Sequence, residues 1–127
     1  MEKLNLMAAW IGVFLGLLSG IPMGLAFHKE NWLGGYDSWE RRLLRLAHVS
    51  FFGIAFLNFA FVGTVSYLKA DPQSLLWASR LFILAMITMP TVCAAAAFKK
   101  QLRHLFAVPV LSIIGATTIF LYQEFLR

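Results

Sequence analysis

Uncharged stretches of membrane-spanning length alternate along this chain with short, charged connections. Each stretch can cross a hydrocarbon core about 30 Å thick at about 1.5 Å per residue. In lipid, the backbone groups of a spanning segment must be satisfied within that segment, which predicts helices. The four uncharged or nearly uncharged stretches are Leu4–Phe27, Leu46–Leu68, Leu75–Phe98 and Leu105–Tyr122, with Arg80 near the start of the third.

With their flanking turns, these stretches predict helices over about 4–27, 43–68, 73–98 and 102–124, and an interfacial loop over 28–42. Short connections make consecutive helices antiparallel neighbours. The predicted fold class is an all-α integral membrane protein, a four-transmembrane-helix up-down-up-down bundle with a single domain over 1–127. In such a bundle the second and fourth helices lie diagonally opposite.

Composition agrees with a membrane protein. Of 127 residues, 60% are hydrophobic and 13% charged, and the mean hydropathy is +0.73. The single cysteine, Cys93, excludes an internal disulfide and any CxxC motif. The chain has no P-loop, HExxH or nucleophile-elbow motif, so we do not expect an enzyme on its own.

The basic residues lie beside the apolar stretches, which favours contact with lipid head groups over nucleic acid. We therefore expect the bilayer and other membrane-protein subunits as partners. The end with the first and third connections carries the larger cluster: Lys29, Arg41, Arg42, Arg45, Lys99, Lys100 and Arg103. The opposite end carries Lys3, Lys69, Arg80 and Arg127. The positive-inside rule then predicts an inner-membrane protein with both termini outside and loops 28–45 and 99–104 cytoplasmic.

Glycine recurs at every fourth position of the first stretch, at Gly12, Gly16, Gly20 and Gly24. This spacing lines the glycines along one face of a helix. In a membrane such a face admits a neighbouring backbone, or a flat ligand, at close range. Close packing of helices is the simpler interpretation, and a ligand-binding slot is the alternative.

All three histidines fall at the predicted cytoplasmic side: His28, His48 and His104. In a bundle with diagonal second and fourth helices, His48 and His104 can face each other across the centre. Two imidazoles flanked by Gly20 and Gly24 would form a slot for a b-type haem. Arg45 and Arg103 would pair with its propionates. Alternatively, a histidine near a helix end can simply be a hydrated side chain at the membrane interface. This interpretation suits His48 least.

In this respect the chain resembles the four-helix membrane cytochromes b. The resemblance covers the helix order and His48, His104, Gly20 and Gly24, and it implies a haem b electron-transfer subunit. Those proteins commonly carry a second histidine pair, which has no counterpart here. One b-type haem in a subunit of a larger membrane complex is the preferred hypothesis.

Two further hypotheses remain open. The first is an accessory or assembly subunit of a respiratory or other membrane complex that binds no cofactor. The second is a copper site, because Met89 and Cys93 share a helix face and can combine with His48, His104 or His28 as soft and imidazole ligands. Separately, Asn58 lies near mid-membrane and is expected to bond to another helix, with Thr117 or Thr118 as the proposed partners.

Overall fold

The computed structural model describes residues 1–126 and is all-helical over this range. The long helices are α1 (Glu2–Ala26), α2 (Trp39–Leu68), α3 (Leu76–Phe98) and α4 (Ala107–Leu121). Short helical turns accompany them: η1 (Trp32–Gly34) after α1, η2 (Lys100–Phe106) before α4 and η3 (Tyr122–Leu126) after it. Four helices are long and apolar enough to cross a membrane, and the fourth is the continuous segment Lys100–Leu126.

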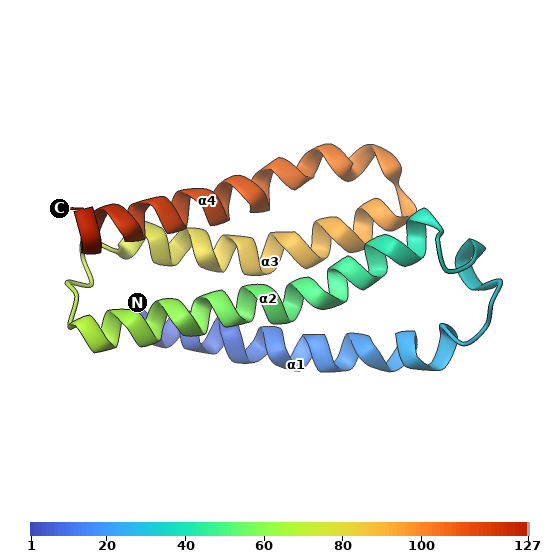
Figure 1. Cartoon of the computed structure of the whole chain (residues 1–127), viewed down its shortest axis with the longest axis horizontal. Helices are drawn as coiled ribbons and strands as arrows, with labels where there is room; N and C mark the ends of the chain where they lie inside the picture. Colours follow the sequence, from blue (N-terminus) through green and yellow to red (C-terminus); the bar gives the residue numbers. More distant parts are fainter. Residues whose placement is uncertain (127) are drawn as a thin grey trace.

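The helices lie side by side in the order α4, α3, α2, α1 at the end that holds the first loop (Figure 1). The main packing is between α2 and α3, with α1 against α2 and α4 against α3. α1 also reaches α3 near its own start. Both termini lie at the opposite end of the molecule from η1 (Figure 1). The inner helices are therefore α2 and α3, and α1 and α4 flank them.

Helix starts differ from the predicted bounds for local reasons. α2 begins at Trp39 because Ser38 caps it, its Oγ accepting from the backbone N–H of Arg41 at 3.2 Å. The α-helical part of the last segment starts only at Ala107, after η2. Pro109 has no N–H to donate to a preceding carbonyl, so it suits the first turn of a helix.

The core is a series of small contacts along the inner helices. Near the termini, aromatic and aliphatic side chains of α2 and α3 pack together with Ala116 of α4. In the middle, Ala9 of α1 packs with Ile54 and Ala55 of α2 and with α3. Near the basic end, Leu43 meets Ala96 and Ala97. Alanine at these contacts lets the backbones approach closely, as is typical of membrane helices.

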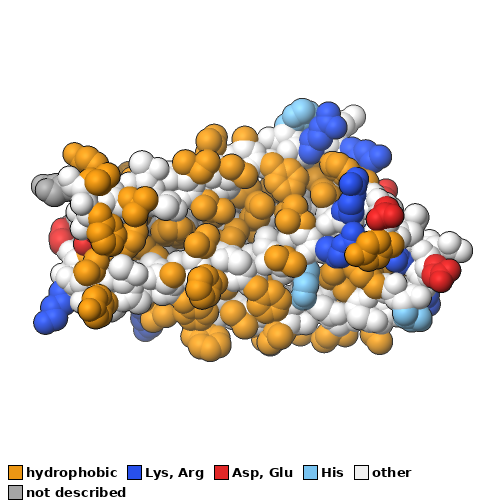
Figure 2. All heavy atoms as spheres, viewed as in Figure 1, with side chains coloured by type: hydrophobic (Ala, Val, Ile, Leu, Met, Phe, Trp, Pro, Cys, Tyr) orange, Lys and Arg blue, Asp and Glu red, His pale blue; other side chains and the backbone are white. Residues whose placement is uncertain are grey.

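The outer surface is mostly apolar. Figure 2 shows hydrophobic side chains over the middle of the visible face, with most Lys and Arg side chains at the end near the loops. Large apolar side chains such as Trp10, Phe56 and Leu111 are exposed. In water such a surface would aggregate, whereas in a bilayer it contacts lipid. We conclude that this is a multi-pass membrane protein. One of the basic residues counted in the sequence, Arg127, lies outside the described residues.

Candidate functional site

His48 lies on α2 and faces α1. Its Nδ1 is 2.8 Å from Oγ of Ser19. The same oxygen lies 2.8 Å from the carbonyl oxygen of Gly16. The Ser19 hydroxyl can donate to either acceptor, so the direction of its hydrogen bond with His48 depends on the imidazole tautomer. Nε2 of His48 has no hydrogen-bond partner among residues 1–126.

The glycine face of α1 packs against the inner helices over most of its length. A Cβ on Gly12 would lie 2.5 Å from Cε of Met86, and one on Gly16 would lie 2.7 Å from Cζ of Phe52. A Cβ on Gly20 would lie 3.2 Å from Cε1 of His48, whereas Gly24 has open space. The simpler interpretation, close packing, thus describes the first three glycines, and Gly20 also abuts the histidine.

Arg41 is a buried cation that holds the first loop against α2. Its side chain is only 2% exposed. Nε donates to the carbonyl of Trp32 at 2.6 Å, and the two terminal nitrogens donate to the carbonyls of Phe27 and Lys29. The guanidinium also lies over the rings of Phe27 and Trp32. This residue therefore closes the C-terminal end of α1, where carbonyls lack helical partners.

Arg45, predicted to bind a propionate, lies one turn further along α2. Its guanidinium stacks on Tyr36 with 4.4 Å from Cζ to the ring centroid, and Nη2 donates to the carbonyl of the same residue at 3.1 Å. Nη1 is buried and has no hydrogen-bond partner among residues 1–126. One donor of Arg45 is therefore free for an anionic group.

The other predicted ligands have different surroundings. His104 and Arg103 are exposed on η2, which packs against α3, and His28 is exposed beyond the end of α1. Because α1 and α4 flank the inner pair on separate sides, the structure does not bring His104 to His48. The fold thus offers one imidazole at the α1–α2 contact and another at the surface near α4.

The soft ligands of the copper hypothesis, Met89 and Cys93, both lie on α3. Cys93 is fully buried, and Met89 packs on the apolar cluster around Ile54. Residues 1–126 contain no group of three or more His, Cys, Asp or Glu side chains that could hold a metal ion.

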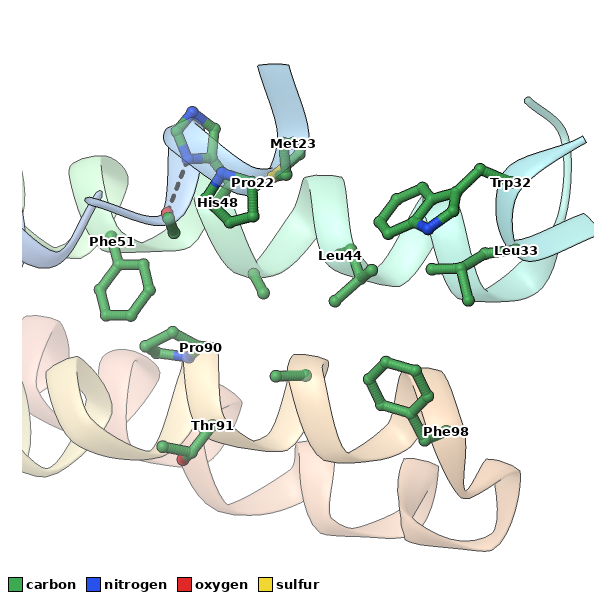
Figure 3. A pocket seen from close by; sticks show the side chains of 13 residues that line it. Pro22, Met23, Trp32, Leu33, Leu44, His48, Phe51, Pro90, Thr91 and Phe98 are labelled. Atoms are coloured by element: carbon green, nitrogen blue, oxygen red, sulfur yellow. Dashed lines mark hydrogen bonds between the residues drawn. The ribbon is translucent and has the colours of Figure 1, made fainter. Parts of the chain in front are cut away.

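A pocket of about 580 Å³ lies beside His48 between α1, α2 and α3. In Figure 3, Phe51 and Leu44 of α2 face Pro90 and Phe98 of α3 across it, and Trp32 and Leu33 of η1 lie at one end. His48 lies at the α1 edge, and the dashed line marks its hydrogen bond to Ser19. No charged side chain lines this pocket.

Two buried polar features went unrecognised in the sequence. One is a network that joins three helices: Asn5 Nδ2 donates to Asn58 Oδ1 at 2.8 Å, and the hydroxyl of Ser79 donates to Asn5 Oδ1. Asn58 also donates to the carbonyls of Ile54 and Phe82. The expected bond from Asn58 to another helix is present, but its partner is Asn5 of α1 and not Thr117 or Thr118. The other feature is Arg41, which the charge pattern grouped with surface cations.

Comparison of the chain with protein-family models, with curated proteins and with solved structures finds no match. The assignment of any role must therefore come from the geometry of the residues themselves.

Proposed function

We propose that this chain is a small accessory subunit of a larger complex in the inner membrane. It would cross the bilayer as an up-down-up-down bundle, with both termini outside and the basic loops in the cytoplasm. The observation that carries the proposal is how the buried polar side chains are used. Among residues 1–126, the six polar residues that are buried as a whole all bond within the protein: Asn5, Arg41, Ser50, Asn58, Ser79 and Ser112.

Such a use of polar groups supports a structural role. Interhelical hydrogen bonds fix helices relative to one another, and a satisfied network has no group left to react with a substrate. The face drawn in Figure 2 is apolar over its middle, with most of its Lys and Arg side chains at one end. A rigid subunit with that surface is suited to packing against other membrane helices within a complex.

The test is native electrophoresis of tagged chain extracted in mild detergent from its own membranes. We expect it to migrate with a complex much larger than 14.3 kDa, and we expect deletion of the chain to lower the amount of that complex. Migration as a small species, together with unchanged membrane complexes in the deletion strain, would refute the accessory role.

A second candidate is electron transfer through one b-type haem with His48 as an axial ligand. It is favoured by the unpartnered Nε2 and by the hydrogen bond between Nδ1 and Ser19, because metal-ligating histidines usually have their other ring nitrogen fixed by a hydrogen bond. The free Nη1 of Arg45 would suit a propionate. The second axial ligand would come from another subunit, since His104 is exposed on η2.

A reduced-minus-oxidised absorption spectrum of the intact complex tests this candidate. We expect His48→Ala to remove the haem signal assigned to this subunit, and His104→Ala and His28→Ala to leave it. A complex with no such signal, or a signal that needs His104 and not His48, would exclude this form of the haem hypothesis.

A further inference from the structure

The first turns of α2 and the start of η2 bring basic side chains together at one end of the molecule. Trp39 joins the two segments: its Nε1 donates to the carbonyl of Ala96 at 2.8 Å, and Nζ of Lys100 lies 5.8 Å from its ring centroid. Arg42 and Arg45 follow Trp39 at intervals of three residues, so they continue one face of α2. We call Arg42, Arg45 and Lys100 the α2–η2 cluster.

The charges of the α2–η2 cluster are not neutralised within the described part of the chain. Arg42 and Lys100 are exposed and Arg45 is partly exposed. Segments 28–45 and 99–104 together hold seven Lys and Arg against three Asp and Glu. No carboxylate of the described residues forms an ion pair with the cluster. Stacking on an aromatic ring leaves the N–H groups at the edge of a guanidinium able to donate, so the cluster can bind an anion from outside the chain.

The cluster lies where the exposed apolar face of α2 ends. Leu46, Val49 and Phe56 follow Arg42 on the same face and are exposed. Val49 is seven residues from Arg42, about 10 Å along the helix axis. Figure 2 shows the same change over the visible face, from an apolar middle to Lys and Arg at the end near the loops. A ligand bound at the cluster would therefore have its anionic group at the membrane interface and could extend along α2 into the hydrocarbon core.

From this arrangement we infer that the α2–η2 cluster binds the phosphate of an anionic glycerophospholipid, with the acyl chains along the exposed face of α2. Phosphate oxygens accept hydrogen bonds from guanidinium and ammonium groups, and these charge-assisted bonds are the stronger kind. The acyl chains would contact Leu46 and Val49. The inference is independent of the accessory role, and the haem candidate would need only Arg45 of the three cations.

Other anionic ligands match only part of this surface. A free phosphate would contact the cations but not the apolar face beside them. An acidic segment of another protein would reach the cations from the aqueous phase and would likewise leave Val49 and Phe56 to other lipids. A zwitterionic phospholipid has the same phosphate and acyl chains, but its choline ammonium would be repelled by three cations. A net negative headgroup on a diacyl lipid is the ligand that matches both the charge and the apolar face.

The experiment measures lipid binding to the purified full chain in detergent by native mass spectrometry. The probes are dioleoylphosphatidylglycerol and dioleoylphosphatidylcholine, which have the same acyl chains and differ in the net charge of the headgroup. We expect at least about tenfold tighter binding of the phosphatidylglycerol, since each basic residue near an anionic headgroup contributes roughly a factor of five. Equal binding of the two lipids, or tighter binding of the phosphatidylcholine, would overturn the inference.

Charge variants locate the lipid. Arg42→Gln and Lys100→Gln should each weaken phosphatidylglycerol binding about fivefold, and the double variant more than tenfold. Both residues are exposed, so the helical content measured by circular dichroism should not change. The matched control is Arg80→Gln, which removes an exposed arginine that stacks on Trp77 near the other end of the bundle, with 5.2 Å from Cζ to the ring centroid. Equal weakening in the control would show a general attraction to positive charge and refute the site.

Two competitors separate a lipid from other sources of negative charge. Glycerol 3-phosphate carries the phosphate without acyl chains, and a peptide of ten glutamates represents an acidic protein segment. We expect neither to displace phosphatidylglycerol when present in equal amount. Displacement by glycerol 3-phosphate would show that phosphate alone is recognised, and displacement by the peptide would show an acidic partner; either result would refute the lipid site. Because the chain is measured alone, these results do not depend on whether it migrates with a larger complex.

Discussion

The two outer helices, α1 and α4, are attached to the inner pair in different ways although both are largely exposed. In their most apolar 18-residue windows, 22% of the residues of α1 and 17% of those of the Lys100–Leu126 segment are buried, against 39% for α2 and 44% for α3. By burial alone, α1 and α4 are therefore nearly equivalent. The kinds of contact that they make with the inner helices are different.

α1 is fixed by directional and close contacts at three levels. Asn5 bonds to α2 and α3 at one end, the glycine face meets Phe52 in the middle, and Arg41 holds the carbonyls beyond Ala26 at the other end. Each contact depends on one residue type. The position of α1 is thus specified along its whole length.

α4 makes mainly apolar contacts. Ala116 lies in the cluster near the termini, and Phe120 packs edge-on against Phe61 with 5.6 Å between ring centroids. Among residues 1–126, the side-chain hydrogen bond of α4 runs from Ser112 to Val108 in the same helix. Contacts of this kind tolerate small displacements, so α4 is the helix better able to adjust to a neighbouring subunit.

The largest change in the free energy of unfolding is expected for a substitution at the close contact between α1 and α2. Gly16→Leu would place a side chain where a Cβ already lies 2.7 Å from the ring of Phe52, so either this ring or α1 itself must move. We expect a loss of about 3 kcal/mol in the free energy of unfolding, measured by denaturation in mixed micelles. Leu17→Ala, at a position 62% exposed, is the control and should cost much less. Equal tolerance of both changes would show that the glycine face is not a contact.

Next in size is the network of Asn5, Asn58 and Ser79. Asn58→Leu removes the acceptor of Asn5 Nδ2 at a fully buried position, and should cost about 1–3 kcal/mol. Thr64→Val is the control, because its hydroxyl bonds only to Ala60 within α2. Thermal unfolding of both variants gives the comparison. A loss no larger than that of the control would mean that apolar packing alone holds α1.

The membrane-spanning helices were predictable because each is a long run of apolar residues, which can be recognised without knowing what the helix packs against. The glycine spacing likewise identified the close face of α1. The order of the helices was not predictable, because all four spanning stretches are mostly apolar and their sequences do not mark which two lie inside. His48 and His104 were paired on the assumption of diagonal helices, which the packing of α4 on α3 does not support.

The polar features were missed for a different reason. Asn5 lies within one turn of Glu2 and Lys3, so the sequence groups it with the polar residues at the start of α1, and only the crossing of three helices brings it to Asn58 and Ser79. Arg41 belongs to a cluster of cations in which its neighbour Arg42 is exposed. Helical phase could have separated these two arginines, since residues one position apart point about 100° apart.

The third effect concerns that pair of arginines. Arg41→Met keeps a long apolar stem but leaves the carbonyls of Phe27, Lys29 and Trp32 without their donor, and should cost about 2 kcal/mol. Arg42→Met should have little effect. Hydrogen exchange should rise in the segment 27–36 of the first variant only. Equal exchange in both variants would show that the loop does not depend on the buried guanidinium.

The smallest change in the free energy of unfolding is expected for Gly115→Ala on α4. Its sign should be opposite to that of Gly16→Ala on α1. A Cβ on Gly115 would lie 3.3 Å from a terminal methyl of Leu81, which is the flexible end of a side chain and can move by a few tenths of an ångström. Alanine is favoured over glycine within a helix by up to about 1 kcal/mol. Gly115→Ala should therefore change the free energy of unfolding by less than about 1 kcal/mol, in the stabilising direction. Gly16→Ala, which meets a ring at 2.7 Å, should destabilise. If denaturation in mixed micelles gave the same sign for both, the two outer helices would be held by the same kind of contact, and the distinction between α1 and α4 would fail.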